Sequence, residues 1–212
     1  MTLDTLQAIR HRRTIKAMSH TPLPATPVDK AFIETLIESA YWAPFHYTAH
    51  ANHKQALTAE LPFRFYVLDS ATCREVAKRL QDSGVKAGKL QSMLHTADYL
   101  IQATWTPQPH DGAQLFEPSL ANMEHIAAAG AAIQNLLLAA TALGRENYWG
   151  SGGVLRDEFA FEWLDIPKAE VLLGALFIFP DADSDMEGVE FKTSPKRDKR
   201  GALGTCYRWV TL

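Results

Sequence analysis

A cluster of basic side chains near the N-terminus holds the residue types in this sequence that are best suited to binding chemistry. The run from Arg10 to Lys16 contains three arginines, a histidine, a lysine and a threonine, although the whole chain has a formal net charge of -3. The planar guanidinium of arginine, the point charge of lysine and a hydroxyl donor together suit a phosphate group. A solvated helix end is the alternative, because cations also favour the last helical turn, where carbonyls lack partners.

A second candidate is the glycine-rich segment Trp149-Gly150-Ser151-Gly152-Gly153. It follows a predicted short strand and precedes a helix predicted to begin near Arg156. Its spacing is not GxGxxG, so we predict no dinucleotide-binding turn here. Gly-Ser-Gly is also a common turn, and Trp149 has the alternative of being a core residue.

Three histidines, His46, His50 and His53, have the spacing of one helical face. Neutral imidazole is a good zinc ligand. The segment lacks HExxH, its flanking residues offer no carboxylate, and it could equally be a loop. We therefore predict no metal site.

The C-terminal region changes from acidic to basic residues. Its cations are Lys192, Lys196, Arg197, Lys199, Arg200 and Arg208. A solvated tail is one interpretation. An RNA-binding tail is disfavoured because the run is short and Asp198 interrupts it.

The composition is typical of a cytoplasmic enzyme. With 212 residues, of which 47% are hydrophobic, the chain can bury one substantial core, and we expect one domain over 1–212, with 190–212 as a C-terminal extension. Cys73 and Cys206 fit no metal or redox spacing, which favours a reducing compartment. The sequence shows neither a signal-peptide pattern nor an apolar run of about 18 residues, so we expect no membrane span. The near-neutral charge balance disfavours a nucleic-acid binder.

Alternating helical and strand patterns must position these residues, and they predict an α+β fold with one sheet inside a helical shell. Periodicity and capping predict helices at 3–9, from an N-cap at Thr26-Pro27 to Tyr41, and at about 71–80, 87–96 and 119–143. Alternating or continuous apolar runs predict strands at 63–68, 98–105 and 171–179.

Taken together, these segments resemble the nitroreductase family of flavoproteins. The matching segments occur in order along most of the chain: Arg12-Arg13-Thr14-Ile15-Lys16, Ala40-Tyr41-Trp42-Ala43-Pro44, Pro62-Phe63-Arg64-Phe65-Tyr66-Val67, residues 129–140 with Leu143-Gly144, and Trp149-Gly150-Ser151-Gly152. The resemblance implies a mostly antiparallel sheet enclosed by helices. It also implies an FMN-dependent enzyme that takes hydride from NADH or NADPH and reduces nitroaromatics, quinones or similar small acceptors by a ping-pong mechanism. A flavin-binding carrier or sensor without turnover is the alternative.

The resemblance also suggests which residues bind the flavin. Arg12 and Thr14 would contact the phosphate and ribityl chain, with Arg13 beside them, and Lys16 would lie near the pyrimidine edge. The backbone of Gly150, Ser151 and Gly152 would approach N5, with Trp149 packed on the cofactor. The family pattern is broken between Pro44 and Pro62, where His46 is expected to face the ribityl or phosphate region. Lys199 with Arg200, or Arg197 with Lys199, would reach the phosphate.

The predicted helix at 119–143 has only small residues at 127–132. Small side chains allow another backbone to approach closely, and family members are dimers that pack such a helix against its symmetry mate. A two-fold contact is self-complementary, so one stripe serves both copies. The resemblance therefore implies a homodimer, whereas an ordinary buried core helix is the alternative.

Overall fold

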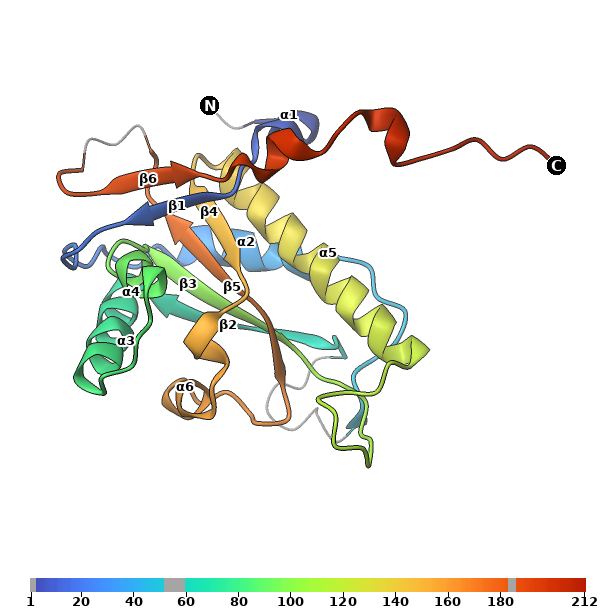
Figure 1. Ribbon diagram of the computed structural model, residues 1–212, viewed down its shortest axis with the longest axis horizontal. Helices are drawn as coiled ribbons and strands as arrows, with labels where there is room; N and C mark the ends of the chain where they lie inside the picture. The colour runs from blue at the N-terminus through green and yellow to red at the C-terminus, as the bar shows by residue number, and fades with distance from the viewer. Residues whose placement is uncertain (1–2, 52–59, 183–185) are drawn as a thin grey trace.

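A four-stranded antiparallel sheet forms the centre of the protein (Figure 1). The computed structural model describes residues 3–51, 60–182 and 186–212. The strand order is β2 (Phe63–Asp69), β3 (Tyr99–Trp105), β5 (Val171–Phe179) and β4 (Glu146–Gly150), and each neighbouring pair is antiparallel. The continuous apolar run of β5 forms an interior strand, as the sequence predicted.

Helices cover both faces of this sheet. On one face, α2 (Lys30–Tyr41) and α5 (Leu120–Ala142) pack against β3 and β5 through a core that includes Leu36 and Leu136. On the other face lie α3 (Ser70–Asp82), α4 (Lys89–Leu94) and α6 (Glu158–Trp163), with a second core that includes Leu80 and Phe177. The predicted α+β class with an enclosed sheet is confirmed.

The long helix α5 is apolar enough to cross a membrane by length and composition, but 50% of its most apolar window is buried. That burial lies against the sheet and α2, which is the pattern of a core helix. Ser119 caps it by accepting from the backbone N–H of Asn122.

A second, two-stranded sheet brings the two basic regions of the chain together. β1 (Ile15–Met18) pairs antiparallel with β6 (Glu190–Thr193), and Lys16 lies opposite Lys192 in this register. The short helix α1 (Thr5–His11) precedes β1, and a capping box between Asp4 and Gln7 begins it. Figure 1 shows this small sheet beside β4, at one edge of the central sheet.

Two local predictions from the sequence are wrong. The N-cap of α2 is Asp29, not Thr26, because the Thr26 hydroxyl instead contacts Ser70 and Asp98. Trp149 and Gly150 belong to strand β4 itself rather than following it. The helix predicted to begin near Arg156 is α6, which begins at Glu158 after a 3-10 turn (Gly153–Arg156). Of the two alternatives for the histidine segment, the loop is the one observed: His46 and His50 lie in irregular chain, so these two histidines share no helical face.

The buried carboxylate Asp98, at the start of β3, gives a test of pH dependence. It accepts from Arg145 Nη1 at 3.1 Å and from Thr26 Oγ1 at 3.4 Å. Burial raises the pKa of Asp98 and outweighs Arg145, Thr26 and Arg74, which lower it. A carboxyl pKa that is raised by folding stabilises the fold below the unfolded pKa, and that contribution is lost as pH rises through the folded pKa.

We therefore expect the free energy of unfolding of the wild type, relative to Asp98→Asn, to fall as pH rises from about 4 to about 8. The amide that replaces the carboxylate does not titrate in this range, so Asp98→Asn is the reference against which the pH dependence of Asp98 is measured. Urea denaturation across this range measures it. Parallel stability profiles for the two proteins would contradict the assignment.

Candidate functional site

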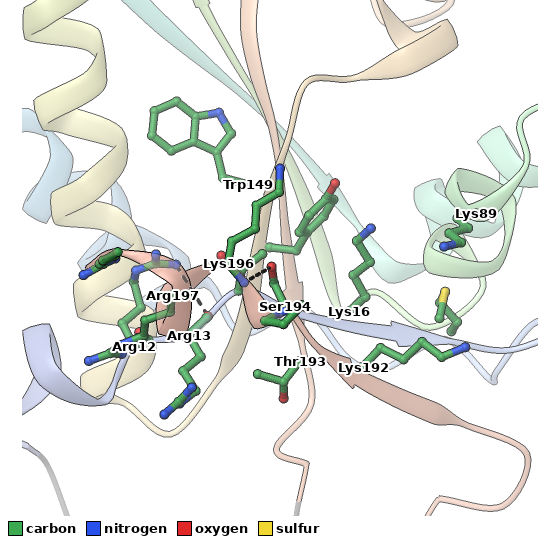
Figure 2. Close-up of a pocket in the computed structure, with 15 residues that line it drawn as sticks. Arg12, Arg13, Lys16, Lys89, Trp149, Lys192, Thr193, Ser194, Lys196 and Arg197 are labelled. Atoms are coloured by element: carbon green, nitrogen blue, oxygen red, sulfur yellow. Dashed lines mark hydrogen bonds between the residues drawn. The ribbon is translucent and has the colours of Figure 1, made fainter. Parts of the chain in front are cut away.

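A cavity of about 560 Å³ lies where the small sheet meets β4 and α4 (Figure 2). Eight cationic side chains line it: Arg12, Arg13, Lys16, Lys89, Lys192, Lys196, Arg197 and Arg200. Its remaining lining residues are Thr14, Met18, Tyr148, Trp149, Thr193, Ser194 and Pro195, so no carboxylate occurs among the lining residues that the structure describes. The electrostatics of the cavity therefore favour an anionic ligand over a neutral or cationic one.

Pairing of the first and sixth strands positions the cavity wall. Ile15 lies opposite Thr193, and the backbone N–H of Ser194 donates to Thr14 O at 2.8 Å just beyond the paired residues. The Ser194 hydroxyl then accepts from the Lys196 N–H, and Pro195 begins the 3-10 turn Pro195–Lys199. Strand pairing thus sets which C-terminal cations face the N-terminal basic run.

Arg197 ties these two segments together. Its guanidinium donates to the backbone carbonyls of Arg10 and Arg12, at the end of α1. These carbonyls are among the last of the helix, where the next turn provides no donor. Arg197 therefore has a structural function in addition to its charge.

Arg12 is held among other cations. Burial lowers the pKa of Arg12, and the nearby charges of Arg197 and Arg200 lower it further. Because a guanidinium keeps its proton in proteins, the shift reflects an electrostatic cost to the folded state. The Arg12 side chain also reaches Asn147 Oδ1 at 3.4 Å, which fixes its direction. A bound anion at this position would offset the repulsion among the three arginines.

Lysines occupy another part of the cavity. Figure 2 shows Lys16 and Lys89 apart from Arg12, Arg13 and Arg197. Lys16 Nζ lies 4.6 Å from the centre of the Tyr148 ring, which is a cation–π distance. The cavity thus offers an arginine-rich end and a lysine-rich end with an aromatic wall.

Seven of the residues that the sequence predicted for the site line this cavity: Arg12, Arg13, Thr14, Lys16, Trp149, Arg197 and Arg200. The other five, His46, Gly150, Ser151, Gly152 and Lys199, are not among its lining residues. Gly150 directly follows the lining residue Trp149 in the sequence, and Gly152 lies two residues further on. At Gly152, φ is +102° and an added Cβ would lie 2.5 Å from Leu172 Cδ2, so this turn requires glycine.

His46 lies outside the residues that line this cavity. Its Nδ1 is 3.3 Å from Glu124 Oε2, near the start of α5. His53, the third histidine of the predicted spacing, lies outside the described residues. Within the part of the chain that is described, no group of three or more His, Cys, Asp or Glu side chains could hold a metal ion.

Trp149 packs across the sheet onto Gly174 of β5. A Cβ added at Gly174 would lie 2.2 Å from Trp149 Nε1, so the glycine makes room for the indole. We expect Gly174→Ala to displace Trp149, which is already 37% exposed, and to destabilise the fold by about 1–3 kcal/mol. A red shift in tryptophan emission measures the displacement. The same substitution in a Trp149→Phe background should leave emission unchanged, and equal shifts in both backgrounds would exclude Trp149 as the source.

Eight lining residues were missed as site residues in the sequence: Met18, Lys89, Tyr148, Lys192, Thr193, Ser194, Pro195 and Lys196. Lys192 and Lys196 belong to the basic C-terminal run, but only the pairing of β6 with β1 determines their direction. Tyr148 directly precedes Trp149 in a strand, where successive side chains point to opposite faces. Choosing Trp149 for the site therefore argued against Tyr148, yet both residues line the cavity. Lys89 comes from α4, and no local pattern connects it with the N-terminal run.

Comparison with known proteins gives a consistent result. The sequence model of the nitroreductase family matches residues 9–178. Comparison with proteins of curated function gives no match.

Solved structures share the fold at low sequence identity. A protein assigned as a nitroreductase in complex with FMN, from Desulfovibrio desulfuricans, is 20% identical with a TM-score of 0.62, and the match covers 100% of this chain and 99% of that one. A nitroreductase family protein from Clostridium novyi NT is 17% identical over 86% of this chain and 87% of its own, with a TM-score of 0.59. A nitroreductase with bound FMN from Bacteroides fragilis is 17% identical over 87% of this chain and 92% of its own, with a TM-score of 0.55.

Proposed function

Because the chain belongs to the nitroreductase family, we propose that it is an FMN-dependent oxidoreductase that uses NADH or NADPH to reduce nitroaromatics, quinones or similar electrophilic acceptors. The observation that carries this proposal is the cavity lined by eight cations and no carboxylate among its described lining residues. The similar structures from Desulfovibrio desulfuricans and Bacteroides fragilis, which contain FMN, support it.

The residues present fit FMN in size and charge. A volume of about 560 Å³ is within the range of cavities that hold small cofactors. Burial and the nearby charge of Arg197 both disfavour the charged form of Arg12. A phosphate dianion bound beside the Arg12 guanidinium would stabilise that charge. An aromatic ring, Tyr148, lies at the other end beside Lys16. One cavity thus offers groups for both the phosphate and the ring.

The chain's own residues would bind and orient rather than react. FMN, when bound, supplies the hydride chemistry at N5 and thereby couples NAD(P)H to the acceptor in a ping-pong cycle. Arg12, Arg13, Thr14 and Arg200 would hold the phosphate end. Lys16 would place a positive charge at the ring end, where it favours added electron density. No side chain is required as a general acid, and we propose none.

Lys16→Ala tests this electronic role. Loss of one cation near the ring should lower the reduction potential of the bound flavin by about 30 mV or more, since 30 mV corresponds to about 1.4 kcal/mol for a two-electron couple. Lys16→Arg should restore most of the potential, because it keeps the charge. Anaerobic titration against a reference dye measures the potentials. An unchanged potential in Lys16→Ala would remove Lys16 from this role.

The rest of the predicted backbone site remains a proposal. Gly150, Ser151 and Gly152 would approach N5 through the backbone. His46 would face the ribityl or phosphate region and Lys199 the phosphate, although neither lines the cavity.

We also propose that the chain is one domain over 1–212, that it acts in the cytoplasm as a homodimer through α5, and that it uses neither membrane nor nucleic acid. Sedimentation at micromolar concentration tests the dimer, which a monomer would contradict.

Turnover separates the enzyme from a flavin carrier. The purified protein, loaded with FMN, is mixed anaerobically with NADPH and then with a nitroaromatic. The proposal predicts loss of the flavin absorbance followed by its recovery as the acceptor is consumed. A bound flavin that NADPH and NADH both fail to bleach would favour a carrier or sensor.

A further inference from the structure

The lysine-rich end of the cavity is built by two elements that lie far apart in the sequence. Lys16 belongs to β1, and Lys89 is the first residue of α4. Both line the cavity, and Figure 2 shows them on the side away from Arg12. Two ammonium groups that line one cavity repel each other, so other contacts must hold the walls that carry them. The contacts between α4 and β1 therefore determine this end of the cavity.

Hydrogen bonds from the last turn of α4 and the two residues after it hold the end of β1. The Thr96 hydroxyl donates to Ala17 O at 2.8 Å. The Ser19 backbone N–H donates to Ser92 O at 3.1 Å. On the other side of the same peptide, Ser19 O lies 3.1 Å from His95 Nδ1. Thr96 and His95 are both buried, so water cannot take over these hydrogen bonds if they are lost.

The partners of His95 define its tautomer. Ser19 O can only accept, so Nδ1 carries the hydrogen and donates it. On the opposite side of the ring, His95 Nε2 lies 3.2 Å from Gln91 Nε2, and that amide nitrogen also donates to Ala77 O of α3 at 2.8 Å. Because Ala77 O accepts, the nitrogen end of the Gln91 amide faces the ring, and His95 Nε2 must accept. The imidazole is therefore neutral, with its N–H directed at β1.

We propose that His95 is a positioning residue for the flavin site. Its Nδ1–H fixes the end of β1 against α4 and thereby places Lys16 at the same end of the cavity as Lys89. His95 is not among the residues that line the cavity, so it acts through Ser19 O, which lies three residues after Lys16. This inference rests on the proposed function, since the charge of Lys16 acts on the bound flavin.

Reduction potentials test whether His95 acts through Lys16. Protein loaded with FMN is titrated anaerobically as wild type, His95→Leu, Lys16→Ala and the double variant. We expect His95→Leu to lower the potential in the same direction as Lys16→Ala. In the Lys16→Ala background it should produce less than about a third of that shift, because two residues that act as one unit are not additive. Additive shifts, or no shift in His95→Leu alone, overturn the proposal.

Two further variants separate positioning from general stability. His95→Asn keeps an N–H near the place of Nδ1, so it should restore the wild-type potential, whereas His95→Leu should weaken FMN binding about threefold to tenfold. Val76→Ala, in the buried core of α3, should lower the midpoint of urea denaturation without moving the potential. Equal potentials for His95→Asn and His95→Leu, or a shifted potential in Val76→Ala, would contradict positioning by the Nδ1–H.

The placement of the two lysine positions can also be measured without flavin. Lys16→Cys and Lys89→Cys are combined in a Cys206→Ser background and spin-labelled, and the distance between the labels is recorded by electron paramagnetic resonance. We expect His95→Leu to shift or broaden the distance distribution and His95→Asn to leave it unchanged. An unchanged distribution in His95→Leu overturns the inference. A shifted distribution in a protein that binds no FMN would contradict the proposed function and leave the role of His95 in placing β1 supported.

Discussion

Arg12→Ala is expected to weaken FMN binding by about 10–100-fold. A charge-assisted hydrogen bond contributes about 1.5–3 kcal/mol, and each 1.4 kcal/mol is a factor of ten in affinity. Burial lowers the pKa of Arg12, and the nearby charges of Arg197 and Arg200 lower it further, so a bound anion would relieve an electrostatic cost at this residue. Fluorescence quenching of FMN on titration with apoprotein measures the affinity.

The same substitution should have an opposite effect on the protein without ligand. Removing Arg12 relieves the repulsion from Arg197 and Arg200, so the melting temperature of the apoprotein should stay level or rise while the stabilisation by FMN is lost. A simple folding defect would lower the melting temperature instead.

Arg13→Ala is the matched control for Arg12→Ala. Arg13 lines the same cavity but is more exposed and lies 3.5 Å from Asp198, which already compensates part of its charge. Exposed ion pairs contribute about 0–1 kcal/mol, so FMN affinity should fall less than about fivefold. Equal losses for the two variants would mean that the cavity acts through net charge alone.

Arg197→Ala should produce the second-largest loss, about 10–50-fold in FMN affinity together with about 1–2 kcal/mol of stability. Two effects combine, because Arg197 contributes a cation to the cavity and also donates to the carbonyls of Arg10 and Arg12. Without those hydrogen bonds the C-terminal wall is no longer fixed to the end of α1. Titration with FMN and urea denaturation measure the two losses separately.

Lys199→Ala distinguishes between the two possible registers of the C-terminal basic run. The sequence left open whether Lys199 with Arg200, or Arg197 with Lys199, reaches the phosphate, and Lys199 is not among the residues that line the cavity. We expect less than a threefold loss of FMN affinity from a solvated surface lysine. A larger loss for Lys199→Ala than for Arg197→Ala would reverse the register.

Periodicity in the sequence was sufficient for most of the fold. The apolar run at 171–179 is the interior strand β5, and the helix predicted at 119–143 is α5, capped by Ser119. Both elements are long, and their patterns are dominated by burial on the core side. The Thr26 cap failed because a tertiary contact to Ser70 competes with the local capping preference, and Asp29 begins the helix instead.

Residue types and spacing alone predicted only the N-terminal half of the site, whereas Trp149 and Arg200 were predicted from the family resemblance. Arg12, Arg13, Thr14 and Lys16 form one local cluster, so their types and spacing indicated an anion site, and all four line the cavity. The other half depends on pairing between distant strands. The register that places Lys16 opposite Lys192 is a long-range property, and local patterns do not encode it.

Lys89 lines the cavity but was not predicted, whereas His46 was predicted but does not line it, and long-range packing explains both differences. Lys89 enters the cavity from α4, which follows a glycine at φ +56°, and the position of that helix is set by packing on β1. His46 was predicted from a family position, but in this chain it lies beside Glu124.

The visible absorption spectrum of the freshly purified protein, before and after incubation with FMN and gel filtration, tests the central claim most directly. We predict flavin absorbance that elutes with the protein at about one FMN per chain, and that Arg12→Ala largely abolishes. Absence of flavin from the wild-type protein after incubation with excess FMN would contradict the claim that the cationic cavity is a flavin site.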